Sequence, residues 1–232
     1  MHPAGARIVR VAAERLPRWC ANFEAAHGST AYAFIEDGLR LDAADGSSAV
    51  IRAPFGRRPG SDLSALSVDL SAPSADFSAL SADLPALSAM AGMCEPPEDW
   101  GVLLVRKGGF AVARLAGGAA RARKVGQRHV QGRTKAGGQS QQRFARRRDN
   151  QARSAYEAAA GHAAERLLSP PAPVVVTGGD RAAIDAVLSD PRLTRLRDAV
   201  VDDWLDVPDP RGAVLDAAIR DAHAPTIEVT NA

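Results

Sequence analysis

The sequence predicts an α/β protein with two layered parts. Short runs in which apolar and polar residues alternate, typical of strands, are interspersed with segments whose apolar residues recur at helical spacing. The composition, 46% apolar and 24% charged over 232 residues, is that of a globular chain long enough for one or two domains. We expect a small α+β unit over 1–60, an insert or linker over 61–95 and an α/β domain over 96–232.

The N-terminal unit is predicted to contain one helix and four strands. Residues 12–27 carry Leu16, Trp19 and Phe23 at helical spacing, and this helix should stop before Gly28. Asp-Gly pairs at 37–38 and 45–46 indicate turns between strands. The predicted strands are Ile8–Val11, Ala31–Ile35, Leu39–Leu41 and Ser48–Ile51.

Residues 61–95 are rich in Ser, Ala and Leu, and the leucines keep a spacing of three to four residues. This pattern indicates broken amphipathic helix, interrupted by Pro73 and Pro85. Two interpretations stay open. The segment packs on its own domain, which we favour, or it offers a coiled-coil site to a partner.

The third part begins with three predicted strands and an exposed loop. The loop, at 126–142, is too polar and too rich in glycine to pack. A helix from Gln142 to Leu168 should follow, with alanines and Leu167 near one face, and it would span roughly 40 Å. The strands are Val102–Val105, Phe110–Leu115 and Ala119–Val125.

The remaining elements continue the alternation of strands and helices. A buried-type strand at 173–177 turns through Gly178 and Gly179 into a helix at 181–189, with Asp180 as its N-cap. The same Gly-Gly turn is a weak phosphate-site candidate, because it lacks the Lys and Ser/Thr of a P-loop. A strand at 200–207 and a final helix at 211–223 complete the prediction.

Positive charge is concentrated in one segment. Between Arg121 and Arg153 there are eleven Lys or Arg residues and one acid, Asp149, so this segment carries +10 and the rest of the chain −8. A basic block of this density is typical of a nucleic-acid contact, although a solvated helix face is the simpler alternative.

A Gly-Gly-Gln tripeptide, Gly137, Gly138 and Gln139, stands in the centre of the basic segment. Glycine lets a loop approach another molecule where a Cβ would clash. The glutamine amide donates and accepts hydrogen bonds without titrating, so it positions water better than it acts as a base. The Gln139 backbone N–H can face a developing oxyanion or a leaving ribose oxygen. A flexible turn with a solvated glutamine is the alternative.

The tripeptide continues as Gln-Ser-Gln-Gln-Arg-Phe-Ala-Arg-Arg-Arg, and this stretch resembles the active loop of archaeal and eukaryotic class-1 peptide release factors. Residues 98–223 resemble their middle domain. Trp100–Leu115 also looks like the Vms-like release factors, stand-alone hydrolases that free nascent chains from stalled large ribosomal subunits. The short helix and hairpins before the insert, with a single compact hydrolase domain, look most like the actinobacterial branch of that family. The resemblance implies an RNase-H-like layered domain. The codon-reading and GTPase-binding domains of the class-1 factors have no counterpart here, nor have the zinc finger and ankyrin repeats of eukaryotic Vms-like members.

The resemblance also implies a function and its residues. We expect a codon-independent peptidyl-tRNA hydrolase with Gly137, Gly138 and Gln139 as the catalytic tip. Its partners would be the large subunit, its rRNA and P-site peptidyl-tRNA, with split subunits and intact ribosomes both open as targets. The predicted RNA contacts are Arg133, Lys135, Arg143, Arg146, Arg147 and Arg148.

Two other functions stay as alternatives: a non-catalytic ribosome- or RNA-binding protein of the same fold, and an RNA nuclease, which would need clustered carboxylates for metal ions. The two cysteines, Cys20 and Cys94, predict no disulfide framework, and no Cys/His spacing indicates a metal site. No apolar run reaches the length of a membrane span. We expect a cytoplasmic monomer without a cofactor.

Overall fold

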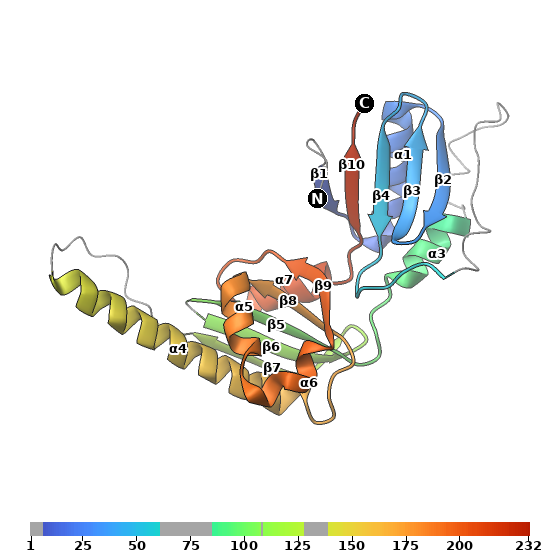
Figure 1. Ribbon diagram of the computed structural model, residues 1–232. Coiled ribbons are helices and arrows are strands. Elements are labelled where there is room, and N and C mark those ends of the chain that lie inside the picture. Colours follow the sequence, from blue (N-terminus) through green and yellow to red (C-terminus); the bar gives the residue numbers. More distant parts are fainter. Residues whose placement is uncertain (1–6, 61–84, 108, 128–138) are drawn as a thin grey trace. The chain divides into compact units, whose positions relative to one another are not determined.

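The computed structural model describes residues 7–60, 85–107, 109–127 and 139–232. These residues fall into two compact units (Figure 1). The first unit comprises Met1–Glu95 together with His223–Ala232, and the second comprises Pro96–Ala222. In the described part each unit contains a five-stranded sheet with helices packed on it, so the predicted α/β class is confirmed.

The sheet of the first unit is antiparallel, with the strand order β1-β10-β4-β3-β2. Four of its strands were predicted, but β10 was not. Because β10 pairs with both β1 and β4, the last ten residues belong to the first unit, whereas the sequence assigned 96–232 to one domain. The strands are β1 (Arg7–Arg10), β2 (Thr30–Ile35), β3 (Gly38–Ala43), β4 (Ser48–Arg52) and β10 (Thr226–Thr230).

Helices α1 (Leu16–His27) and α3 (Pro85–Met93) share a core with this sheet. A short 3-10 helix, η1 (Ala13–Arg15), precedes α1. Pro85 is the first described residue of α3, and proline has no N–H to lose in the first turn of a helix. Residues 85–93 therefore pack on their own unit, while Pro73 and the rest of 61–84 lie outside the described residues. The shared core includes Leu16, Phe23, Tyr32, Ile51, Leu87 and Met90.

The second unit has a mixed sheet in the order β7-β6-β5-β8-β9. The first three strands form an antiparallel meander, and β8 and β9 continue it in parallel. Parallel neighbours need crossovers, which α4 (Gln139–Leu167) and α5 (Arg181–Leu188) supply. The strands are β5 (Trp100–Arg106), β6 (Gly109–Ala116), β7 (Ala119–Gln127), β8 (Val175–Gly179) and β9 (Val200–Leu205).

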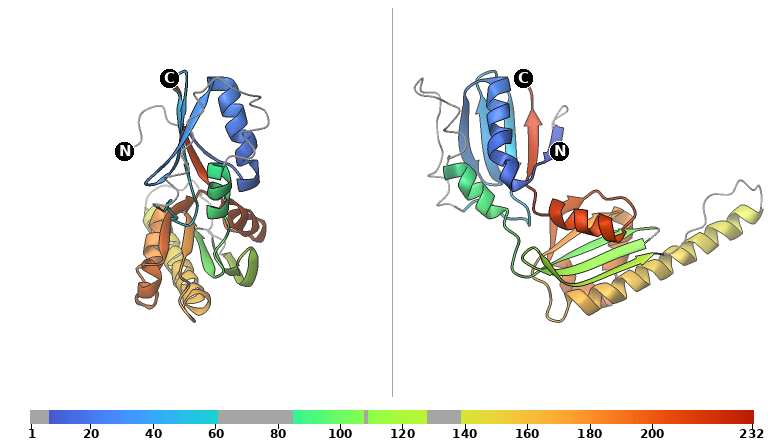
Figure 2. Two further views of the ribbon diagram at one scale, coloured as in Figure 1. Left: turned by 90° about the vertical axis from the view of Figure 1, so that its right-hand side faces the viewer. Right: turned by 180° about the vertical axis from the view of Figure 1, so that it is seen from behind.

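Helices cover both faces of the second sheet. On one face α4 and α5 share a core with Leu103, Val105 and Val112, and α7 (Gly212–Asp221) lies on the other face (Figure 2). Beside α5, the 3-10 helix η3 (Pro191–Leu193) and the short helix α6 (Thr194–Arg197) contribute Leu193 and Leu196 to the same core. The sequence did not predict these two short helices.

The loop predicted at 126–142 is shorter at both ends. Gly126 and Gln127 pair with β6 as part of β7. The ring of Phe110 occupies the space where a side chain at position 126 would lie, so glycine lets the strand continue there. Helix α4 begins at Gln139 instead of Gln142, since Gln and Ser in a first turn need no core contact to be helical. Residues 128–138 lie outside the described part.

Candidate functional site

Helix α4 begins at Gln139, the last residue of the Gly-Gly-Gln motif, and its C-terminal half is anchored on the sheet. Ala155, Ala159, Ala163 and Leu167 are buried at intervals of four residues, which places them on one face. Three of these four side chains are alanines, so the helix axis lies close to the strands. At the last contact Gly101 leaves room for Leu167, because a Cβ there would lie 2.7 Å from Leu167 Cδ2. The anchored half fixes the direction of the whole helix.

The N-terminal half of α4 continues past the edge of its own sheet (Figure 1, Figure 2). At 1.5 Å per residue, Gln139 lies roughly 24 Å along the axis from Ala155, the first buried anchor residue. The first turn of any helix leaves backbone N–H groups without intrahelical acceptors, and the helix dipole adds positive potential there. The position of Gln139 therefore combines reach with hydrogen-bond donors.

The predicted site residues divide into those on the helix and those before it. Gln139 is the first residue of α4. Gly137, Gly138, Arg133 and Lys135 lie outside the described residues. The remaining four predicted RNA contacts stand on α4, although their side chains also lie outside the described part; they are Arg143, Arg146, Arg147 and Arg148.

The strand that leads to the motif ends on a tightly packed hairpin. An added Cβ at Gly126 would lie 2.3 Å from Phe110 Cε1, so the ring rests directly on the glycine. Phe110 also stacks against His162 of α4, with 5.5 Å between the ring centroids. Between this hairpin and α4 lies a small cavity of about 200 Å³ lined by Phe110, Gln127 and Ala155, among others. The departure point of the loop is thus fixed against the anchored half of the helix.

Strand β7, which precedes the motif in the sequence, adds exposed positive charge. Arg121 and Lys124 are exposed on this edge strand, and Arg123 forms an exposed ion pair with Asp216 at 3.1 Å. An exposed ion pair of this kind contributes little to stability because solvent screens it. The basic block seen in the sequence therefore begins on a solvent-facing strand and continues onto the projecting part of α4.

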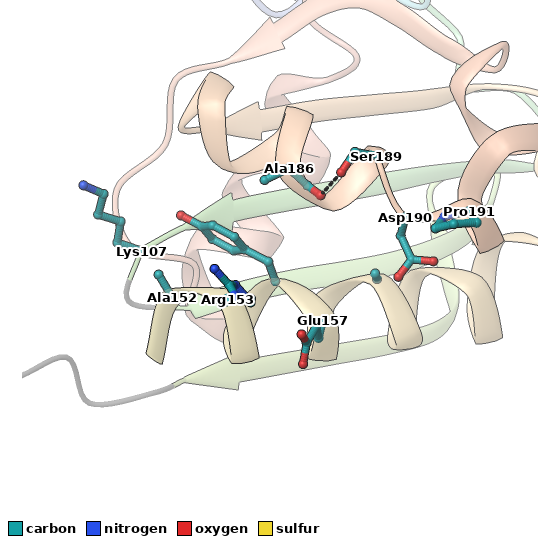
Figure 3. Close-up of a pocket in the computed structure, with 10 residues that line it drawn as sticks. Lys107, Ala152, Arg153, Glu157, Ala186, Ser189, Asp190 and Pro191 are labelled. Atoms are coloured by element: carbon teal, nitrogen blue, oxygen red, sulfur yellow. Dashed lines mark hydrogen bonds between the residues drawn. The ribbon is translucent and has the colours of Figure 1, made fainter. Parts of the chain in front are cut away.

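An open cleft of about 530 Å³ lies between α4 and the end of α5 (Figure 3). Lys107 and Arg153 lie at one end, and Glu157 and Asp190 lie toward the other. Asp190 accepts hydrogen bonds from Arg192 Nε at 2.9 Å and Nη2 at 2.7 Å, and these bonds lower the pKa of Asp190 to about 2. An aspartate held ionised in this way is a poor general acid near neutral pH.

The Gly178-Gly179-Asp180 segment has a packing role. A Cβ on Gly178 would lie 2.3 Å from the carbonyl oxygen of Leu205, so the neighbouring strand requires glycine. Gly179 has φ of 105°, and a Cβ there would lie 2.3 Å from the carbonyl oxygen of Val105. Both glycines belong to β8 rather than to a turn. As predicted, Asp180 caps α5, accepting from the Ala183 N–H at 3.2 Å, so the helix N-terminus is occupied by the chain's own carboxylate.

The described histidines have structural partners. His162 Nδ1 lies 3.2 Å from Glu165 and 3.1 Å from Arg166, and His27 Nδ1 lies 2.8 Å from Asp45. Within the ranges that the structure describes, no three His, Cys, Asp or Glu side chains are grouped to hold a metal ion. The helices of the same ranges are too short or too polar to cross a membrane.

Sequence comparison places most of the second unit in a known family. Residues 98–228 match the family described as the Actinobacteria/Chloroflexi VLRF1 release factors. A search of curated proteins found no match. The matched range begins just before β5, includes all of α4 with Gln139, and covers more than half of the 232 residues. By this match, the chain belongs to the Actinobacteria/Chloroflexi VLRF1 release factor family.

Proposed function

We propose that this protein is a codon-independent peptidyl-tRNA hydrolase that frees nascent chains from stalled large ribosomal subunits. The observation that carries the proposal is the position of Gln139 as the first residue of a helix whose other end is packed on the sheet. Membership in a release factor family supports the proposal. The proposed partners are the large subunit, its rRNA and the P-site peptidyl-tRNA, and we propose a monomer in the cytoplasm.

The reaction needs positioning more than acid–base strength. Water attacks the ester carbonyl carbon, the bond to the ribose oxygen breaks, and a proton goes to that oxygen, giving a free peptide and a tRNA. In our proposal the Gln139 amide orients the water, and its backbone N–H donates to the oxyanion or to the leaving oxygen. Each preorganised donor of this kind lowers a barrier by about 3 to 4 kcal/mol. Gly137 and Gly138 would let the backbone approach the ester without a Cβ clash.

Delivery into a pocket of RNA depends on reach and charge. The roughly 24 Å of helix before Ala155 would carry the tip away from the body of the unit. The eleven basic residues between Arg121 and Arg153 would neutralise phosphates along the way. In this proposal Arg133, Lys135, Arg143, Arg146, Arg147 and Arg148 contact rRNA.

We also propose that the second unit has the RNase-H-like fold of release-factor middle domains. The strand order, with an antiparallel meander continued by two parallel strands, supports this assignment. The proposed hydrolase domain begins at residue 96, the start that the sequence predicts. In this proposal the motif acts on the ester, and β7 and α4 supply the basic residues that bind RNA.

Replacing one amide tests the proposal. Gln139→Ala should slow single-turnover release of peptide from stalled large subunits by at least about 100-fold, because it removes the side-chain amide that orients the attacking water. Binding to the subunit should change by less than about twofold, since one amide adds little to an interface dominated by charge. Gly138→Ala should act in the same direction.

Gln142→Ala is the matched control. It removes the same amide from the next turn of α4 and should leave release unchanged. Equal release by wild type and Gln139→Ala would contradict the catalytic assignment. If the wild-type protein binds the subunit and releases nothing, the protein is a binding module of the same family.

A further inference from the structure

The first unit contains a basic pocket outside the range matched by the release factor family. Its volume is about 350 Å³, and it is lined by Arg10, Val11, Ala12, Arg15, Arg18, Trp19 and Asn22. These residues come from the end of β1, from η1 and from the first two turns of α1. The size falls within the range of sites for small ligands or single nucleotides.

Three arginines converge on this pocket, and no acidic residue lines it. Arg10, Arg15 and Arg18 are all exposed. Arg15 and Arg18 have no ion pair with any acid in the part of the chain that the structure describes. The one acid near them in sequence, Glu14, is exposed and does not contribute to the lining. Arg15 and Arg18 carry like charges that repel each other, and an anion would relieve that repulsion.

Trp19 gives the pocket an aromatic wall that the core holds in place. Its ring stacks on Phe23, with 5.5 Å between centroids and 15° between the planes, and Phe23 is buried. Trp19 itself is only partly buried while it lines the pocket. Asn22 stands on the same face of α1, three residues further along, and adds an amide that both donates and accepts hydrogen bonds.

We propose that this pocket binds single-stranded RNA. Guanidinium groups match phosphate geometry and carry a charge at every physiological pH, so Arg15 and Arg18 take the backbone. A base stacks on the fixed indole of Trp19, and Asn22 contacts its edge. An acidic peptide would use the arginines but would gain little from the stacking wall, and for this reason we favour RNA.

The site is distinct from the proposed hydrolytic tip, because residues 10–22 lie outside the range 98–228 and in the other compact unit. A second RNA contact would raise the affinity for a ribosomal particle through two linked binding events. It does not depend on peptide release, so it stands even if hydrolysis at Gln139 is not found.

A fluorescein-labelled uridine oligonucleotide of 12 residues is the probe. Its binding to the full chain is measured by anisotropy at several salt concentrations. All proteins carry Arg143→Ala, Arg146→Ala and Arg147→Ala, which reduces binding by α4. Arg15→Ala with Arg18→Ala should flatten the plot of log affinity against log salt by about 0.7 for each phosphate that the protein no longer neutralises. Trp19→Leu, which keeps an apolar contact with Phe23, should weaken binding about tenfold.

Arg40→Ala with Arg58→Ala is the matched control, since it removes the same charge from the same unit at exposed positions outside the pocket. Thermal unfolding of each variant separates weaker binding from a damaged fold. The control should keep the slope of the parent protein, which carries only the three α4 substitutions. Equal slopes for the two double variants would overturn the proposal. Binding of a polyglutamate peptide that depends on Arg15 and Arg18, with no effect of Trp19→Leu on the oligonucleotide, would assign the pocket to an acidic protein instead.

Discussion

Gly126 occupies a position where the fold has no room for a side chain. It is the penultimate residue of β7, and a Cβ there would lie 2.3 Å and 2.4 Å from two ring atoms of Phe110. Phe110 is 5% exposed and stacks on His162 of α4, so a shift of its ring would disturb this contact with the helix. One glycine thus sets the packing at the point where the chain leaves β7 for the motif.

Gly126→Ala should therefore destabilise the second unit by about 1 to 3 kcal/mol, the cost typical of overpacking a filled core. Urea unfolding followed by circular dichroism measures the change. Phe110→Leu in the same chain should recover part of the stability, because the smaller side chain leaves room for the methyl group added at position 126. Gly118→Ala is the control: nothing lies within 4 Å of its added Cβ, and it should be nearly neutral. If both alanine variants unfold alike, the ring does not constrain this position.

Arg114 illustrates a residue whose environment sequence could not predict. The sequence placed it in a strand and did not predict that its side chain would be buried, with only 8% of the residue exposed. Its Nε donates to Asp99 at 2.8 Å, and Nη1 donates to the carbonyl of Pro170. The guanidinium also lowers the pKa of Asp99. These partners lie 15 and 56 residues away, and no local pattern encodes such a convergence.

At the scale of elements, sequence predicted best what repeats locally. The buried face of α4 was predicted because Ala155, Ala159, Ala163 and Leu167 recur at helical spacing, and these four are buried. Its start was placed three residues late, since polar residues in a first turn resemble those of a loop. Strand β10 was missed, although Ile227 and Val229 alternate with polar residues, because its five residues follow a helix and pair only with β1 and β4 from the other end of the chain.

Helix α4 yields a prediction about electrostatics. Arg143, Arg146 and Arg147 stand at i, i+3 and i+4, positions that share one face of a helix. Replacing all three by Ala should weaken binding to the large subunit. It should also flatten the dependence of log affinity on log salt by about 2 to 3, since each contact with a duplex phosphate contributes about 0.9. Filter binding of the purified subunit at several salt concentrations gives both numbers.

The comparison variant is Arg195→Ala, Arg211→Ala and Arg220→Ala, which removes the same charge from exposed positions elsewhere in the second unit. Its slope should stay at the wild-type value. Equal slopes for the two triple variants would mean that α4 contributes only to the net charge of the protein, and the predicted rRNA contacts would then be wrong.

At the scale of the whole molecule, the family match and the compact units do not coincide. The match runs through 98–228 and so extends from the second unit into β10 of the first. The two ends of the chain form one sheet, in which β10 lies between β1 and β4. The second unit is therefore inserted between two segments of the first, and this arrangement depends on pairing across more than 170 residues, which periodicity alone does not reveal.

The residues assigned to hydrolysis and to rRNA binding lead to a prediction about the substrate. Every residue that we assign to hydrolysis or to rRNA belongs to the segment from Arg121 to Arg153, and none of these roles requires a codon. Gly178 and Gly179, a weak phosphate-site candidate in the sequence, are packed against neighbouring strands, and Asp180 caps the helix that follows, so nucleotide hydrolysis has no assigned site there. The protein should therefore release peptide from P-site peptidyl-tRNA on isolated large subunits, where no mRNA is present. Added GTP should change the rate of release by less than about twofold, because in the proposed chemistry positioned hydrogen-bond donors alone stabilise the transition state.

Release is measured on split large subunits and on ribosomes programmed with a stop codon, each with and without GTP, and Gln139→Ala serves as the blank in all four reactions. Release confined to stop-codon ribosomes would overturn the rescue assignment and would point to a codon-reading element in the first unit, whereas release that requires GTP would point to a GTPase partner.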